Sequence, residues 1–210
     1  MKEPQQVTRS SLAWSAAAAG RVSRHRWSQP NGWWGMVLFL CAEVTLFGTL
    51  IATYFYLDFD APRWPPAGIK APSVVLPLVA TGVLVSTSIP MWLADRAGRS
   101  GRRKPVIGLI SLAVVVQVCY LAVQVLLFRH DLNDFSPRDT AYGSIYFTLL
   151  GAHHAHVILG ILLNLFVLGF VIVRGLHNYW LIGVRSVALY WYVVNVLAVL
   201  VVLTQLAPSL

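Results

Sequence analysis

Charged residues are scarce in this chain. Of its 210 residues only 11% are Asp, Glu, Lys or Arg, whereas 57% are hydrophobic. Ordinary soluble domains carry about a quarter charged residues, so the composition indicates lipid as the solvent. Five stretches with almost no charge occupy most of the chain and leave no segment long enough for a separate soluble domain.

Cysteine is scarce too. Cys41 and Cys119 lie in different apolar stretches, where a small apolar thiol packs readily. Their spacing indicates neither a disulfide nor a zinc site. The chain also lacks a nucleophile triad, a phosphate loop or a dinucleotide fingerprint in a supporting context. We therefore expect a partner of other proteins, with no catalytic residue of its own.

Acidic residues number only eight against sixteen basic ones, which gives a net charge of +8. Such a charge can indicate nucleic-acid binding, so the placement of the charges decides its meaning. Twelve of the sixteen basic residues fall before the first apolar stretch or in every second connection. The positive-inside rule therefore places the N-terminus in the cytoplasm and Leu210 outside, and no nucleic-acid partner is expected.

The apolar stretches predict an all-α membrane protein. A membrane-spanning helix needs about 20 predominantly apolar residues. We expect a basic cytoplasmic arm over 1–31, with a short surface helix at Leu12–Gly20, and then a five-helix transmembrane domain over 32–210. The predicted helices cover about 33–57, 73–94, 105–128, 141–173 and 186–207.

Two of these predicted helices have unusual features. The second contains Pro77 and Pro90, which lipid tolerates only where other groups satisfy the freed carbonyls, and the hydroxyls of residues 86–88 are available for this. The fourth belongs to a stretch of 34 uncharged residues, which as a helix measures about 51 Å against a hydrocarbon core of about 30 Å. It must tilt or project beyond the bilayer.

Glu43 is the one charged residue deep inside a predicted helix. It lies about 15 Å of helix inside the span that starts at Trp33, near the bilayer midplane. An acid there costs on the order of 3 kcal/mol, so it should face protein, be protonated or find a partner. Two interpretations stay open: a proton-active carboxyl, and a structural acid that bonds to another helix.

Three histidines occur together on the fourth predicted helix, and His153 and His156 share a face at a spacing of i, i+3. A metal site needs three or four ligands from more than one element. No other predicted span contains a histidine, so we expect no metal or haem site in this chain. We expect His153 and His156 to form interhelical hydrogen bonds, with Glu43 as a candidate partner.

Further polar residues are predicted to hold helices together. Amides and aromatic groups within membrane spans act as interhelical contacts that contribute perhaps a kcal/mol each. A basic connection between the second and third spans is suited to anionic lipid headgroups. The expected interhelical contacts are Gln117, Gln124, Trp191, Tyr192 and Asn195, and the expected headgroup contacts are Arg99, Arg102, Arg103 and Lys104.

Four motifs occur in order between residues 33 and 200, and together they resemble the signatures of subunit III of the haem-copper cytochrome oxidases. The first surrounds Glu43, the second lies in the first outer connection, the third contains the histidines and the fourth opens the last helix. They are Gly35-Met36-Val37-Leu38-Phe39-Leu40-Cys41-Ala42-Glu43-Val44; Trp64-Pro65-Pro66-x-Gly68-Ile69; Tyr142-Gly143-Ser144 with Gly151-x-His153-x-x-His156-Val157-x-x-Gly160; and Tyr190-Trp191.

The resemblance implies a non-catalytic subunit of a respiratory cytochrome c oxidase in a bacterial plasma membrane. It implies packing on catalytic subunit I, beside subunit II, with haem and copper in the partner and none in this chain. Family members bind phospholipid and are thought to sustain proton uptake and stability during oxygen reduction. Full-length members have seven helices, so this chain resembles the shorter type that lacks the first two.

Departures from the family pattern leave other functions open. Tyr192 and Asn195 stand where the family has a histidine and an aspartate, and Leu127 and Ala42 replace a glutamate and a serine. One alternative is an accessory membrane protein of a bacterial nitric oxide reductase. A second is an independent proton-coupled transporter that uses Glu43, although the chain shows neither an internal repeat nor a broken helix pair.

Overall fold

The computed structural model describes residues 31–69, 75–175 and 178–209, and within these ranges it contains helices and no strand. The all-α class predicted from the sequence is thus confirmed. Apart from Asn31, the predicted N-terminal arm with its surface helix lies outside the described residues. The elements are α2 (Asn31–Asp60), α3 (Val75–Ser86), α4 (Ser88–Arg99), α5 (Arg103–Asp134), α6 (Ala141–Arg174), α7 (Asn178–Leu206) and the 3-10 helix η1 (Ala207–Ser209).

Five helical stretches of the described chain are long and apolar enough to cross a membrane, as predicted. Helices α3 and α4 together make one of them, Val75–Arg99. The longest is α6, whose 34 residues form one uninterrupted helix. A helix of that length exceeds the thickness of a hydrocarbon core, so part of α6 tilts or projects beyond it.

The boundary between α3 and α4 lies at Thr87, three residues before Pro90. Proline has no N–H, so the carbonyl four residues before it loses its helical partner. Here the hydroxyls of Ser86 and Thr87 donate to the carbonyls of Val83 and Leu84, both at 2.6 Å. These bonds go to carbonyls of the turn before the interruption, and not to the carbonyl of Ser86, which is the one four residues before Pro90.

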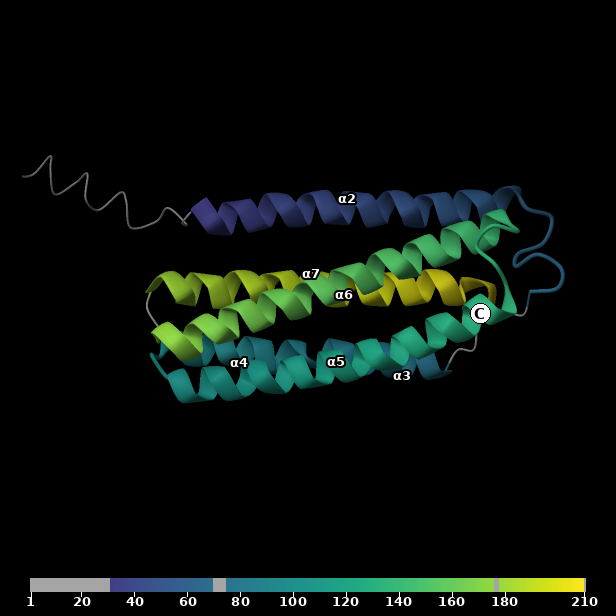
Figure 1. The fold of residues 1–210 in the computed structure, drawn as a ribbon. Coiled ribbons are helices and arrows are strands. Elements are labelled where there is room, and N and C mark those ends of the chain that lie inside the picture. Colours follow the sequence, from purple (N-terminus) through teal and green to yellow (C-terminus); the bar gives the residue numbers. More distant parts are fainter. Residues whose placement is uncertain (1–30, 70–74, 176–177, 210) are drawn as a thin grey trace, which may run out of the picture.

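Helix α7 lies at the centre of the bundle and packs against α2, α3, α4 and α6. Figure 1 shows α6 and α7 between α2 on one side and the group of α3, α4 and α5 on the other. Trp191 on α7 is completely buried. Helix α2 is peripheral, since among the described helices it packs only against α6 and α7, and it exposes most of its apolar side chains.

The start of α6 is fixed by a side-chain cap and a close backbone approach. The Oγ1 atom of Thr140 accepts a hydrogen bond of 3.0 Å from the backbone N–H of Gly143, which satisfies one of the free donors of the first turn. A Cβ atom at Gly143 would lie 2.5 Å from the carbonyl oxygen of Ser136. Only glycine therefore allows the loop before α6 to pass this close to the helix.

Candidate functional site

Glu43 on α2 and His156 on α6 form the polar contact between these two helices. The Oε2 atom of Glu43 lies 2.5 Å from Nε2 of His156. Their side chains are only 16% and 15% exposed. Among the described residues, this is the only side-chain hydrogen bond that joins α2 to another helix.

A second hydrogen bond of His156 determines how many protons the pair holds. Its Nδ1 lies 2.6 Å from the carbonyl oxygen of Ala152. A carbonyl only accepts hydrogen bonds, so Nδ1 carries a proton. The Nε2 lone pair and a carboxylate oxygen are both acceptors, so their contact needs one further proton on either atom. In both arrangements the pair has no net charge, which removes most of the cost of placing Glu43 in lipid.

The surroundings of His156 hold its ring and backbone in position. Phe47 on α2 meets the imidazole edge to face, with the ring centroids 5.1 Å apart. The hydroxyl of Tyr190 on α7 donates to the backbone carbonyl of His156 at 2.8 Å. Phe39 on α2 stacks on Tyr190 with the centroids 6.3 Å apart. Three helices thus meet around this histidine.

Gly160 allows α6 and α7 to approach each other one turn from His156. A Cβ atom at this position would lie 2.7 Å from the ring of Trp191 and 2.9 Å from the ring of Tyr190. Both rings are fully buried. The absence of a side chain at Gly160 therefore permits the packing that places the Tyr190 hydroxyl on the His156 carbonyl.

His153 lies one turn before His156 but contacts α5 instead of α2. Gln124 donates to the hydroxyl oxygen of Tyr120 at 2.9 Å, and this hydroxyl lies 3.3 Å from Nε2 of His153. The Tyr120 hydroxyl can then donate to Nε2, which leaves the imidazole proton on Nδ1. That Nδ1 atom is buried without a partner among the described residues. The two histidines therefore belong to separate contacts with different neighbouring helices, α5 for His153 and α2 for His156.

Two further amide contacts join the remaining helices. Gln117 on α5 is completely buried, and its Oε1 accepts from Nδ2 of Asn164 on α6 at 2.9 Å. Nδ2 of Asn195 on α7 donates to the hydroxyl of Ser88 on α4 at 2.7 Å. Tyr192 is half-buried and lines, with Ser88 and Asn195, a groove of 340 Å³ beside the interruption between α3 and α4.

The four basic residues predicted to contact lipid headgroups have different environments. Arg103 donates to two carbonyls at the end of α6, from Nε to Val171 at 3.1 Å and from Nη2 to Ile172 at 2.5 Å. Arg99 pairs with Asp95 one turn earlier on α4. Arg102 and Lys104 are exposed. Arg103 thus satisfies the free carbonyls of a helix terminus, a role that the sequence did not predict.

Other polar groups of the helices were missed by the sequence reasoning. Asp95 was placed in a connection but lies on α4, 8% exposed, because the helix continues to Arg99. Asp131 accepts from the hydroxyl of Tyr146 at 2.8 Å. Because α5 continues to Asp134, it also carries His130, so the expectation that only one membrane helix has histidines is wrong. These residues could have been placed on helices only by extending the helical spacing of polar residues beyond the apolar stretches.

Among the described residues, no group of three or more His, Cys, Asp or Glu side chains is arranged to hold a metal ion. The polar groups instead form pairs and short chains between helices. What the Glu43–His156 pair can do chemically is hold one exchangeable proton in the middle of the bundle without net charge.

Comparisons with known proteins match the chain over most of its length. A family model described as "Cytochrome c oxidase subunit III" matches residues 16–206. Eight similar curated proteins carry the name cytochrome c oxidase subunit 3. The protein of Pisaster ochraceus is 31% identical over 186 residues, which cover 82% of this chain and 68% of the relative.

Two vertebrate relatives have a similar sequence identity to this chain and a similar coverage. The protein of Loxodonta africana is 30% identical over 174 residues, with 78% of this chain and 64% of the relative covered. That of Coturnix japonica is 28% identical over 172 residues, again with 78% and 64% covered. The chain thus spans a little under two thirds of the length of these two relatives.

Proposed function

This chain belongs to the cytochrome c oxidase subunit III family, and we propose that it is the non-catalytic third subunit of a respiratory haem-copper oxidase. The match over residues 16–206 is the observation that carries the proposal. In this role the chain packs on catalytic subunit I, beside subunit II, while haem and copper in subunit I reduce oxygen. The chain then supports proton uptake and the stability of the complex during turnover.

The outer surface of the bundle supports a role as a packed membrane subunit. Within the described part of the chain, helix α2 contacts only two other helices, and it exposes large apolar side chains along its length, among them Leu38, Leu46 and Phe55. Helix α3 exposes a similar row that includes Val79 and Val83. Such surfaces require lipid or the helices of another subunit as neighbours.

The Glu43–His156 pair supports a role in stability. It attaches the peripheral helix α2 to α6 at mid-depth and carries no net charge. A carboxyl that shares a proton with a histidine can also pass that proton between Oε2 and Nε2 while the pair stays without net charge. We assign Glu43 this combined role as a structural and proton-active acid.

The charge distribution supports a location in a bacterial plasma membrane with the N-terminus in the cytoplasm. At one end of the bundle Arg102 lies between α4 and α5, and Arg103 and Lys104 open α5, whereas the helix ends and the loop at the opposite end carry Asp58, Asp60, Asp131, Asp134 and Asp139. In this orientation Arg102 and Lys104 face the anionic headgroups of the cytoplasmic leaflet.

Copurification tests this proposal. The full chain, tagged at its C-terminus, is purified from native membranes in mild detergent, and its partners are identified by mass spectrometry. We expect an oxidase that contains haem and copper and consumes oxygen. A partner with non-haem iron and no copper would identify a nitric oxide reductase and overturn the proposal. Proton or solute flux by the purified chain alone would replace it with a transporter.

A further inference from the structure

Four oxidisable aromatic rings follow one another at the end of the bundle where α2 ends and α6 begins. They are Tyr54 on α2, Trp64 in the loop that follows, and Tyr142 and Tyr146 in the first two turns of α6. The ring centroid of Trp64 lies 5.4 Å from that of Tyr54 and 4.9 Å from that of Tyr142. The rings of Tyr142 and Tyr146 stack with their centroids 5.7 Å apart. Each ring thus contacts the next, and we call these four residues the aromatic relay.

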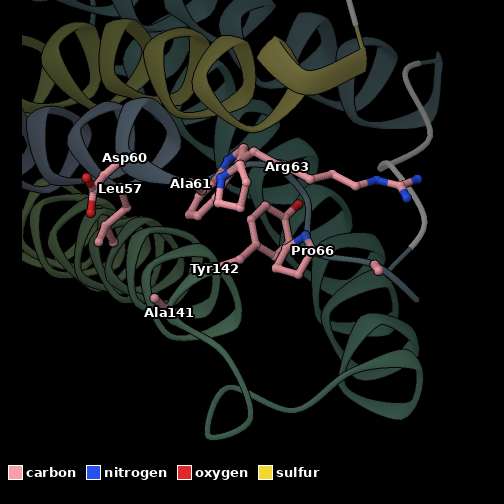
Figure 2. Close-up of a pocket in the computed structure, with 10 residues that line it drawn as sticks. Leu57, Asp60, Ala61, Arg63, Pro66, Ala141 and Tyr142 are labelled. Atoms are coloured by element: carbon pink, nitrogen blue, oxygen red, sulfur yellow. The ribbon is translucent and has the colours of Figure 1, made fainter.

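One end of the aromatic relay opens to the surface of the bundle. A pocket of 470 Å³ is lined by Trp64 and Tyr142 together with residues of the loop. Figure 2 shows Tyr142 projecting from α6 toward the loop that carries Arg63 and Pro66. Trp64 is partly exposed, whereas Tyr146 is only 5% exposed. Electrons can therefore leave or enter the relay at Trp64, while Tyr146 is shielded from solvent.

The buried end of the relay has a proton acceptor. The hydroxyl of Tyr146 donates to Oδ2 of Asp131 on α5 at 2.8 Å. A phenol that loses one electron becomes a strong acid, so its oxidation is easiest where a base accepts the phenolic proton at the same time. Asp131 lies one turn before the end of α5, and its side chain is 27% exposed. It can therefore take the proton of Tyr146 and exchange it with water.

The other two tyrosines of the relay lack such an acceptor. The hydroxyl of Tyr142 has no hydrogen-bond partner among the described residues. The side-chain partner of Tyr54 is Trp64, whose indole N–H only donates. Neither phenol can release its proton to a neighbouring base. An electron vacancy that reaches the relay is therefore most stable on Tyr146.

We propose that the aromatic relay reduces lipid peroxyl radicals at this membrane surface. The peroxyl radical takes one electron at Trp64 and one proton from water, and becomes a lipid hydroperoxide. An electron from Tyr146 passes through Tyr142 and refills Trp64, while the phenolic proton of Tyr146 moves to the carboxylate of Asp131. The products in the protein are a neutral tyrosyl radical and a protonated Asp131. A water-soluble one-electron reductant then returns the electron through Trp64, and Asp131 returns the proton.

Packing alone would explain less of this arrangement. Ring contacts suffice to join α2, the loop and α6, and they need neither a carboxylate on one tyrosine nor a surface opening at the tryptophan. Electron transfer uses both features. The activity is independent of the oxidase assignment, since it depends only on residues of this chain.

Flash photolysis tests the relay in the full chain, reconstituted in nanodiscs. A ruthenium photosensitiser is attached at Ala67→Cys, an exposed position that lines the pocket, after Cys41→Ala and Cys119→Ala have removed the native thiols. A flash with a soluble quencher converts the sensitiser into a one-electron oxidant. We expect a neutral tyrosyl radical, detected by transient absorption and electron paramagnetic resonance, which Tyr146→Phe abolishes.

Asp131→Asn separates proton transfer from packing. The amide oxygen still accepts a hydrogen bond from Tyr146 but cannot take its proton. The tyrosyl radical should form about a hundredfold more slowly, the usual effect of removing a positioned proton acceptor. Tyr192→Phe, a half-buried tyrosine on α7 outside the relay, should leave yield and rate unchanged. A radical that stays on tryptophan in the wild type, an equal tyrosyl yield in Tyr146→Phe, or an equal rate in Asp131→Asn would overturn the proposal.

Lipid oxidation tests the proposed oxidant. Nanodiscs of unsaturated phospholipid receive an azo initiator that generates peroxyl radicals, with ascorbate as the reductant, and oxygen uptake is followed. The wild type should slow the uptake, and both Tyr146→Phe and Asp131→Asn should lose this effect while Tyr192→Phe keeps it. Equal uptake with the wild type and Tyr146→Phe would exclude peroxyl radicals as the oxidant and overturn the proposed activity.

Discussion

Glu43 and His156, which are 113 residues apart in the sequence, meet with Oε2 and Nε2 2.5 Å from each other. The contact joins the peripheral helix α2 to the longest helix of the bundle. Because the second imidazole nitrogen donates to the Ala152 carbonyl, the contact itself holds one proton and the pair is neutral. An acid that would be costly alone in lipid is thus accommodated by its partner.

A double-mutant cycle measures the strength of this contact. His156→Leu leaves the carboxyl of Glu43 without a partner and should lower the free energy of unfolding by about 2 kcal/mol. Glu43→Leu should cost less, because it removes the group that needs a partner. The double variant should cost less than the sum of the two by about 1 kcal/mol. Unfolding of the purified chain in mixed micelles gives these values, and strictly additive effects would exclude a direct interaction.

The close approach of α6 and α7 predicts that Gly160 cannot be enlarged. Gly160→Ala places a methyl group against the rings of Trp191 and Tyr190 and should lower stability by about 1–3 kcal/mol. Gly169→Ala is the matched control, since it lies on the same helix with nothing within 4 Å of an added Cβ. That variant should be neutral or slightly stabilising, because alanine favours helix. Thermal unfolding separates the two, and equal melting temperatures would contradict the packing described.

The two hydrogen bonds of Arg103 predict a structural role at the end of α6. Arg103→Gln removes donors from the carbonyls of Val171 and Ile172 and should lower stability by about 1–2 kcal/mol. Arg102→Gln, its exposed neighbour, should leave stability unchanged. The binding of both variants to vesicles that contain anionic lipid is measured as well. If Arg103→Gln weakens only lipid binding, Arg103 is a headgroup contact and the capping role is wrong.

Most of the fold could be predicted from the sequence because the apolar stretches are long and almost free of charge. Five spans and the all-α class follow from that single pattern. The ends of the helices could not be predicted in this way. Asp95 and His130 lie on helices that continue past their apolar stretches, since helical hydrogen bonding does not stop where hydrophobicity does.

The residues of the site could be predicted from the sequence, but which of them contact each other could not. The cost of an isolated acid identified Glu43, and the spacing of the histidines placed two of them near one face of a helix. A spacing of three residues leaves about 60° between two side chains. Because α6 packs between α2 and α5, that angle directs His156 toward Glu43 and His153 toward Tyr120. Tertiary packing decides this difference, and no local pattern contains it.

The lifetime of the purified complex during turnover tests the central claim, that Glu43 is a proton-active acid of an oxidase subunit. Glu43→Gln keeps the size of the side chain, and its amide can still donate to Nε2 of His156, but it cannot exchange a proton. We predict unchanged haem spectra and faster loss of oxygen consumption during turnover. Thr53→Val, an exposed α2 variant that changes a bond within its own helix, should inactivate like the wild type. An unchanged lifetime in Glu43→Gln, or loss of its haem signal, would contradict the account.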